Sequence, residues 1–395
     1  MPSVLPEIAA IAPELIELRR RIHAHPELAF EETVTSDLVA ECLTAWGYEV
    51  HRGLGGTGVV GVLRSGSGTR SVGLRADMDA LPLAENTGLP YASVNAGKMH
   101  ACGHDGHTAM LLCAARHLAQ TRAFNGTLNL VFQPAEEGFG GARAMMEDGL
   151  FDRFPCDAVF ALHNMPGIAA GDMAFCVGPM AASSDSVTIS LRGMGGHGAF
   201  PHRARDPMPA AGAIMVALQT IVGRDVDPLD AAVISVGSVH AGEAFNIIPE
   251  QVEMRLSVRT LDAKVRQLVE QRIRALVLGQ AESFGLHAEI RYDRGYPVLV
   301  NDRRMTDFAT GIACDLLGEA HVEAQSRPVM GSEDFAYMLE RVPGCYAYIG
   351  NGIGSRGGCM VHNPEYDFND DILAVGASFW VRLTEAWLAR TVADG

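Results

Sequence analysis

The stretch TLNLVFQPAEEG, residues 127–138, joins an apolar run to a proline and a pair of carboxylates. The run 127–133 has the length and composition of a buried strand, and the proline after it marks its end. Similar apolar runs stand at 59–63, 72–76 and 158–163, and an amphipathic helical pattern covers 13–24. This alternation predicts an α/β domain with a central sheet flanked by helices.

The pattern changes between residues 183 and 293. There the periodicity predicts a strand, a helix, two strands, a long helix and a strand, at 186–192, 208–223, 232–239, 251–259, 262–284 and 287–292. The order βαββαβ is that of a ferredoxin-like α+β unit. We therefore expect two domains: a discontinuous catalytic domain of residues 1–182 and 294–395, and an inserted domain of residues 183–293.

Composition excludes several classes of partner. The 395 residues are 48% hydrophobic and carry a formal charge of -16, so we expect no nucleic acid and no anionic membrane surface as partner. The N-terminus does not resemble a secretory signal, and no stretch approaches the roughly 20 apolar residues of a spanning helix. The eight scattered cysteines are typical of reduced thiols, which favours a cytoplasmic location.

Five residues that can bind metal stand far apart, each in a short distinctive phrase: Cys102, His104, Glu137, His163 and His362. A thiolate, a carboxylate and three imidazoles suit zinc or a neighbouring transition metal better than magnesium or calcium. Five ligands are one too many for a closed structural site, so the set predicts a hydrolase with two ions. Taken singly, each residue has an ordinary alternative: a buried inert cysteine or a structural histidine. Cys359, three residues before His362, is a weaker ligand candidate.

The pair Glu136–Glu137 suits two different tasks, because adjacent carboxylates on a turning backbone point in different directions. One can bind metal while its neighbour moves a proton between water and a departing amine. A solvated acidic loop is the alternative. Asp77 and Asp79 would share one face if their strand continued, and could orient a ligand histidine; strand-end caps are the alternative.

The inserted domain carries weaker signals. His197 stands in a glycine-rich turn, and Asn246 and Arg259 lie further along. An imidazole and an amide could stabilise an oxyanion, and a guanidinium could hold a carboxylate, although most Asn and Arg are surface groups. Residues 53–58 fit the dinucleotide pattern GxGxxG, but a strand-like run follows them, so we expect a hairpin or loop there.

Taken together, the phrases HPELAFEE, RADMDALP, MHACGHDGH, QPAEEG, ALHN, GGHGAFPH, FNIIP, GSEDFA and HNPEYDF resemble those of M20-type metallopeptidases. The chain is similar to their amidohydrolase branch, which includes hippurate hydrolases, N-acyl-L-amino-acid amidohydrolases and auxin-conjugate hydrolases. The resemblance runs from about His25 to Phe368. It implies two divalent ions held by the five ligands above, zinc first, with manganese, nickel or cobalt as alternatives. It also implies Glu136 as catalytic acid and base, and Asp79 as a residue that steadies the site.

The resemblance implies further roles in the inserted domain, as a lid and dimerisation domain. It implies a homodimer, or a tetramer, in which His197 serves the partner's active site. Asn246 and Arg259 would help to hold the substrate, and Gly331 and Ser332 would line its pocket. The wider family usually has His at the position of Asp77 and Asp at that of Cys102, so the choice of metal is open.

The activity implied is cleavage of N-acyl-L-amino acids into a carboxylic acid and an amino acid. A dipeptidase and a deacetylase of an acetylated diamino acid are alternatives on the same site. Two alternatives belong to other classes: a metal-free thiol hydrolase that uses Cys102, and a metal-loaded binding protein without turnover.

Overall fold

The chain forms two compact units in the computed structural model, which describes residues 4–354 and 357–389. Unit 1 contains the described residues up to Gly178, Val300–Arg327 and those from Asp334 onward. Unit 2 contains Pro179–Leu299 and the short segment Pro328–Glu333. The chain leaves unit 1 in strand β7 (Gly178–Ala181) and returns in β14 (Leu299–Asn301). The sequence predicted that all of 294–395 belongs to the catalytic domain, whereas Pro328–Glu333 groups with unit 2.

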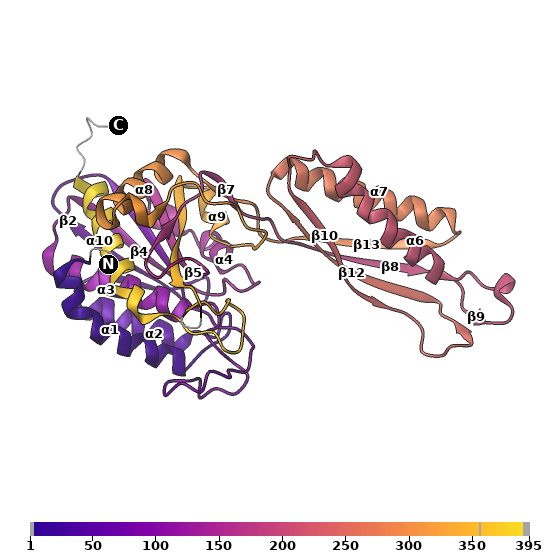
Figure 1. Ribbon diagram of the computed structural model, residues 1–395, viewed down its shortest axis with the longest axis horizontal. Helices are drawn as coiled ribbons and strands as arrows, with labels where there is room; N and C mark the ends of the chain where they lie inside the picture. Colours follow the sequence, from indigo (N-terminus) through magenta and orange to yellow (C-terminus); the bar gives the residue numbers. More distant parts are fainter. Residues whose placement is uncertain (1–3, 355–356, 390–395) are drawn as a thin grey trace. The chain divides into compact units, whose positions relative to one another are not determined.

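Unit 1 is built on an eight-stranded sheet (Figure 1). In spatial order its strands are β1 (Glu49–Leu54), β2 (Gly58–Ser65), β4 (Gly126–Gln133), β3 (Ser71–Asp77), β5 (Ala158–Pro166), β16 (Gly344–Gly352), β6 (Met173–Ala174) and β15 (Val322–Glu323). The central strands β4, β3, β5 and β16 run parallel, so their carboxyl ends meet at one edge. Open α/β sheets hold their sites at such an edge.

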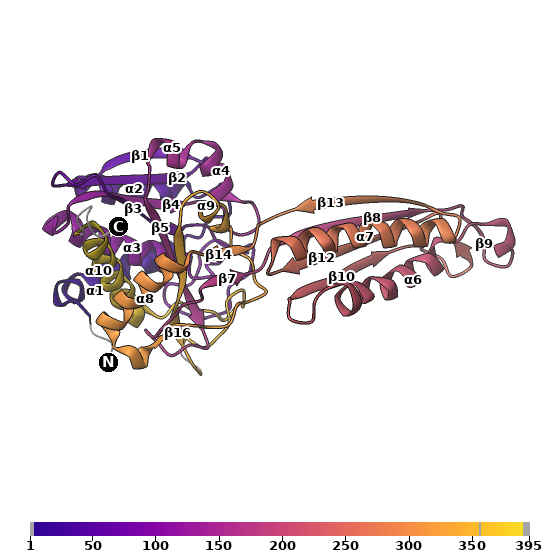
Figure 2. The same cartoon turned by 90° about the horizontal axis from the view of Figure 1, so that it is seen from above.

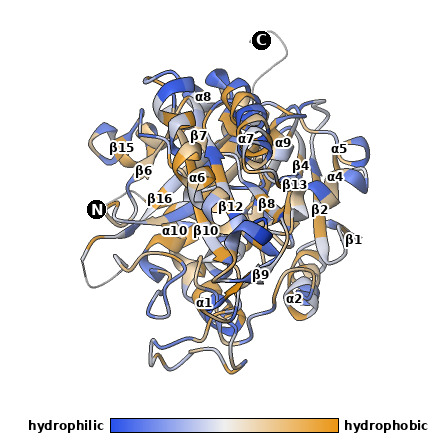
Figure 3. Ribbon diagram, turned by 90° about the vertical axis from the view of Figure 1, so that its right-hand side faces the viewer, coloured by the Kyte–Doolittle hydropathy of each residue, from blue (hydrophilic) through white to orange (hydrophobic). Residues whose placement is uncertain are grey.

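Helices cover this sheet, as the alternating pattern predicted. Those of unit 1 are α1 (Pro6–Ala24), α2 (Thr33–Ala45), α3 (His104–Thr121), α4 (Gly141–Glu147), α5 (Leu150–Arg153), α8 (Arg303–Leu317), α9 (Ala336–Leu339) and α10 (Leu373–Ala389). Helices α3 and α10 pack on the central strands, and helix α1 packs against both of these helices. The interleaved polar and apolar colours of α1 show its two faces (Figure 3).

Helix α1 corrects the start that the sequence suggested. Its first turn contains Pro6, and Pro13 lies inside the helix rather than at its beginning. A proline in the first turn costs no hydrogen bond, because the first N–H groups of a helix have no partner within it. The apolar residues Ile8 and Ala12, before Pro13, are buried in the core and extend the same face.

Unit 2 has the expected βαββαβ order (Figure 2). Its four-stranded antiparallel sheet has the spatial order β10 (Ala232–His240), β12 (Gln251–Thr260), β8 (Asp185–Arg192) and β13 (His287–Arg294). Helices α6 (Pro207–Thr220) and α7 (Ala263–Ser283) share one apolar cluster with the sheet. The buried residues of α7 recur every four positions, from Val265 to Val277. The predicted two-domain α/β and ferredoxin-like fold is therefore confirmed.

Two short segments complete the picture. The glycine-rich residues 53–58 join the antiparallel strands β1 and β2, as expected for a hairpin and not for a nucleotide site. Among the described residues one helical segment, Asp370–Ala389, is long and apolar enough to pass for a membrane span, although no such stretch was expected from the sequence. However, 72% of its apolar window is buried inside the protein, where α10 contributes Phe379, Trp380 and Trp387 to the core.

Candidate metal centre

Cys102 lies at the middle of the candidate ligand groups. Its thiol and one ring nitrogen from each of His104 and His163 all lie within 4.8 Å of one another, with Cys102 Sγ 3.3 Å from His163 Nε2. A second group within the same limit joins Cys102 to Glu137 and His362. The structure thus brings all five candidate ligands together, in two groups of three that share one thiol.

The start of α3 sets the spacing of two of these ligands. Gly103, between Cys102 and His104, has φ +88°, a conformation that favours glycine. A Cβ at this position would lie 2.3 Å from Asn164 Oδ1 and 2.5 Å from Tyr366 Oη. Only glycine fits there, so the chain can turn tightly and aim the thiol and the imidazole to the same side.

His362 reaches the centre from a segment far along the chain. It is one of the few non-glycine residues with positive φ, at +63°, and its backbone N–H donates to the carbonyl of Ala101 at 2.7 Å. That bond fixes His362 beside Cys102. The imidazole is half exposed, and its Nε2 lies 3.1 Å from Glu137 Oε1. His163, by contrast, lies within strand β5 rather than after its end.

Asp79 organises the carboxylate pair. Its two oxygens accept the backbone N–H groups of Glu136 and Glu137, both at 3.0 Å. The same carboxylate lies 3.3 Å from His104 Nδ1. With Nδ1 directed at Asp79, the Nε2 atom of His104 is left for another partner.

Two buried atoms of this centre suit a cation. Within residues 4–354 and 357–389, His104 Nε2 has no hydrogen-bond partner, and Glu137 Oε1 has only the half-exposed imidazole of His362 beside it, at 3.1 Å. Leaving a buried polar atom without a partner costs on the order of 1–3 kcal/mol, and more for a charged group. A metal ion would satisfy both atoms, and the mixed thiol, imidazole and carboxylate set has the ligand types of zinc and its neighbours. The residues present therefore fit a metal.

Asp77 and Asp79 have different surroundings. Strand β3 ends at Asp77, so the condition under which the two carboxylates were expected to share one face of a strand is not met. Arg75 Nη1 lies 2.7 Å from one oxygen of Asp77, and His107 Nδ1 lies 2.6 Å from the other. Asp77, His104 and His107 also form a compact group. The guanidinium on Asp77 would repel a cation there, so Asp77 is better placed to orient His107 than to bind metal.

The nearby carboxylates raise the pKa values of two candidate ligands, His104 and Cys102. Burial lowers the pKa of His104, but the charges of Asp77 and Asp79 outweigh burial and raise the pKa to about 10. Burial and the nearby carboxylate of Glu137 hold the pKa of the Cys102 thiol well above its usual range. Without a cation, the centre keeps protons on both ligands. A divalent ion would displace those protons, because metal ligands bind in their deprotonated forms.

Buried polar residues behind the ligands were not assigned from the sequence. His163 Nδ1 lies 2.6 Å from the carbonyl oxygen of Asn164, and the Asn164 amide lies 2.7 Å from His107 Nε2 and 2.5 Å from Tyr366 Oη. Such partners orient metal-binding imidazoles. These residues stand inside the phrases MHACGHDGH, ALHN and HNPEYDF, which were the available signal, but their contacts with one another could not be predicted from the phrases.

Arg19 forms a second buried layer. Its fully buried guanidinium pairs with Asp105, next to His104, and with Asp367 and Asp370, which follow His362. It thereby ties together two segments that carry ligands. Removal of this one cation would leave the fully buried carboxylate of Asp105 with His23 as its remaining ion-pair partner.

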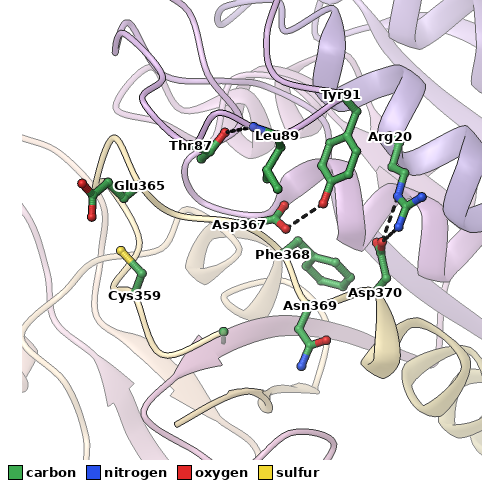
Figure 4. Close-up of a pocket in the computed structure, with 11 residues that line it drawn as sticks. Arg20, Thr87, Leu89, Tyr91, Cys359, Glu365, Asp367, Phe368, Asn369 and Asp370 are labelled. Carbon is green, nitrogen blue, oxygen red and sulfur yellow. Dashed lines mark hydrogen bonds and ion pairs between the residues drawn. The ribbon is translucent and has the colours of Figure 1, made fainter. Parts of the chain in front are cut away.

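A cavity of about 370 Å³ lies on the outer side of this layer (Figure 4). Tyr91 donates to Asp367 there, and Arg20 donates to Asp370. Cys359 lies on the cavity wall and belongs to none of the ligand groups found among the described residues. It is therefore not placed to bind metal with His362.

The candidate residues of unit 2 form two separate sets. His197, in strand β9 (Gly196–His197), pairs with Ile247 of β11 (Ile247–Ile248). The carbonyl of Asn246 accepts the N–H of Gly198 at 2.8 Å, so His197 and Asn246 are neighbours, and both are exposed.

Arg259 belongs to the second set, at the other end of β12. It is half-buried, and its Nη1 donates to Ser332 Oγ at 2.8 Å, beside Gly331. Among the residues that the structure describes, no carboxylate pairs with it. From Gln251, near His197, to Arg259 is eight residues, roughly 26 Å along a strand. Within one copy of unit 2 the two sets cannot meet.

A parallel sheet edge that carries thiol, imidazole and carboxylate donors, with a ferredoxin-like insert, defines the class of a metal-dependent hydrolase. Comparison with known proteins narrows the class. The pattern of peptidase family M20/M25/M40 matches residues 73–386, and the chain belongs to this family. Its expected place in the amidohydrolase branch, as an enzyme, is confirmed by its relatives.

Two curated relatives are similar over almost the full chain. Hippurate hydrolase of Campylobacter jejuni is 47% identical over 98% of this chain and all of its own length. N-acetyl-L-cysteine deacetylase of Bacillus subtilis is 39% identical over 95% of this chain and 88% of its own. Among solved structures, the YXEP protein of Bacillus subtilis, described as a dinuclear metal binding peptidase of the M20 family, has a TM-score of 0.85. It is 33% identical, and the match covers 97% of this chain and 99% of that one.

Proposed function

We propose that this protein hydrolyses the amide bond of N-acyl-L-amino acids, releasing a carboxylic acid and a free amino acid, with two divalent ions. The observation that carries the proposal is the pair of ligand groups that share Cys102. Hydrolysis of related amides is named in the descriptions of its relatives, a hippurate hydrolase and an N-acetylcysteine deacetylase. A dipeptidase remains the alternative on the same site.

Each group of ligands would hold one ion. His104 and His163 would hold the first and Glu137 and His362 the second, and the Cys102 thiol belongs to both groups. Two such ions supply Lewis acidity toward an amide carbonyl and make water more acidic. Zinc suits this donor set best, and manganese, nickel and cobalt are the alternatives.

Glu136 is the proposed proton carrier. It is 7% exposed, so its carboxylate works in a largely dry site, and Asp79 fixes its backbone through the N–H group. Glu136 would take one proton from the attacking water as the C–O bond forms. It would return this proton to the departing nitrogen as the C–N bond breaks. The products are then a carboxylic acid and an uncharged amino group.

Unit 2 would supply substrate contacts. We propose that Arg259, with Ser332 and Gly331, meets the substrate carboxylate, which the acidic surface of the protein otherwise repels. His197 and Asn246 would support the developing oxyanion. Since Arg259 lies at one end of β12 and His197 lies in the β9–β11 ribbon beyond the other end, we propose that His197 serves the partner in a homodimer. Residues 183–293 would then act as lid and dimerisation domain.

The thiol-hydrolase alternative is disfavoured by the electrostatics. A cysteine nucleophile needs a lowered pKa, whereas burial and Glu137 raise that of Cys102. The eight cysteines are free thiols, which supports our proposal of a cytoplasmic enzyme.

A substrate panel tests the proposal. The protein is stripped with a chelator and reconstituted separately with zinc, manganese, cobalt and nickel. It is then assayed on hippurate, N-acetylcysteine, an N-acetyl-diamino acid, an indole-acyl amino acid and a dipeptide. We expect release of free amino acid from at least one N-acyl amino acid, lost on chelation and restored by metal. Hydrolysis that survives complete metal removal, or cleavage of dipeptides alone, would overturn it.

A further inference from the structure

The turn that presents Glu136 is held by two carboxylates. Three consecutive backbone N–H groups, those of Ala135, Glu136 and Glu137, point at carboxylate oxygens. Asp79 accepts the second and third. The first donates to Glu32 Oε1 at 2.9 Å. Successive N–H groups that converge on anions form a rigid concave turn.

The turn is strained at its first residue. Ala135 has φ +53°, in the left-handed region, although it carries a side chain. It is fully buried, and its carbonyl accepts the N–H of Gly141 at 2.9 Å. A non-glycine residue keeps such a conformation only where its surroundings enforce it. The bond from the Ala135 N–H to Glu32 is one of those restraints.

The side chain of Glu32 is buried where it makes this contact. It is fully buried, directly before α2, and its other oxygen accepts the hydroxyl of Thr57 at 2.5 Å. Thr57 stands in the hairpin between β1 and β2, so Glu32 joins that hairpin to the catalytic turn. Burial raises the pKa of Glu32 to about 7, and the charge of Asp79 adds to the rise. A protein that keeps a carboxyl group in such a place bears a cost that its hydrogen bonds must offset.

We propose that Glu32 is a positioning residue for the reaction: it holds Ala135 in the left-handed conformation and thereby aims the carboxylate of Glu136. Glu32 touches neither the ligands nor the substrate in this account. It acts through Ala135 alone. The inference rests on the proposed function in one respect, that Glu136 carries the proton.

Rescue by a second substitution tests this role. Glu32→Ala removes the restraint, and we expect kcat to fall about 10²-fold with little change in KM, since a shift of about 1 Å in a reacting group has that effect. Bound metal per chain should not change. Ala135→Gly in the same chain removes the strain that the restraint opposes. The double variant should recover at least fivefold in kcat.

Two further variants sharpen the test. Glu32→Gln can accept from Ala135 and donate to Thr57, so it should retain kcat within about threefold of the wild type. Glu31→Gln, at the exposed neighbouring position, should change nothing. If Glu32→Ala does not fold, Glu32→Asp withdraws the carboxylate by one methylene and should show a smaller loss with the same rescue.

The proposal is overturned if Glu32→Ala, or Glu32→Asp in its place, keeps wild-type kcat. It is also overturned if Ala135→Gly recovers kcat by less than fivefold, because the lost rate would then not come from strain at residue 135. An enzyme that stays active as Glu136→Gln would overturn the proposed function instead, so the two failures are distinguishable.

Discussion

The two units treat their candidate functional residues in opposite ways. In unit 1 the donor groups are gathered within one chain, and most are buried and supported by further buried charges such as Asp79, Arg75 and Arg19. In unit 2, His197 and Asn246 are exposed at the two-stranded β9–β11 ribbon, and Arg259 lies near the far end of β12 in the four-stranded sheet. A buried charge is tolerated only with partners. Unit 1 therefore gathers its candidate residues in one buried place, whereas unit 2 keeps its candidate residues exposed or far apart within one copy.

The largest effect is expected where the two ligand groups meet. Cys102→Ala removes the one ligand that both share. Hydrolysis should fall more than about 10³-fold, because loss of a bridging ligand disturbs both ions. Metal analysis should show less than the wild-type content per chain. If Cys102→Ala binds two ions and remains active, unit 1 does not form the shared-thiol centre described above.

A smaller loss of activity is expected from a substitution at His197 in unit 2, and it tests whether this exposed residue acts in the reaction. His197→Ala should lower kcat by about 10²-fold, which is typical of a lost oxyanion donor. Mixing this variant with inactive Cys102→Ala should restore activity, since a mixed dimer contains one site with all its residues. Random exchange would give about a quarter of wild-type sites. If mixing under conditions of subunit exchange restores nothing, His197 does not act across a dimer.

The smallest effect concerns stability. The pKa of Glu32 is about 7 in the folded protein, raised by burial and by Asp79 from an ordinary value of 4.5. The folded state therefore holds a proton that the unfolded state has lost, and stability falls as pH rises from about 4.5 through 7. Between pH 5 and 8 the wild type should lose roughly 2 to 3 kcal/mol more than Glu32→Gln.

Denaturant unfolding at both pH values, with the metal content held equal, measures this difference. Because Glu32→Gln cannot titrate, other groups cancel in the comparison. Equal pH dependence of the two proteins would show that Glu32 is ionised throughout, as an exposed carboxylate would be.

The sequence predicted unit 2 almost strand for strand, because its alternating residues and its four-residue periodicity in α7 are local signals. It also singled out the five candidate ligands that the structure brings together, since each stands in a distinctive phrase. It did not predict the left-handed turn at Ala135, which no glycine marks, or the contact with Glu32, 103 residues away. It misplaced the start of α1, because Pro13 suggests a first turn that in fact begins at Pro6. Contacts between distant segments depend on packing and leave no pattern in the chain.

The most direct test of the account is Glu136→Gln, measured for metal content and for hydrolysis of the best substrate in the panel. The substitution keeps the size of the side chain and the backbone bond to Asp79, but the amide cannot take a proton from water. We predict unchanged fold, two ions per chain and a fall in kcat of about 10²–10⁴-fold, the usual contribution of a general acid and base. A variant that keeps its metal and hydrolyses at nearly the wild-type rate would contradict the account.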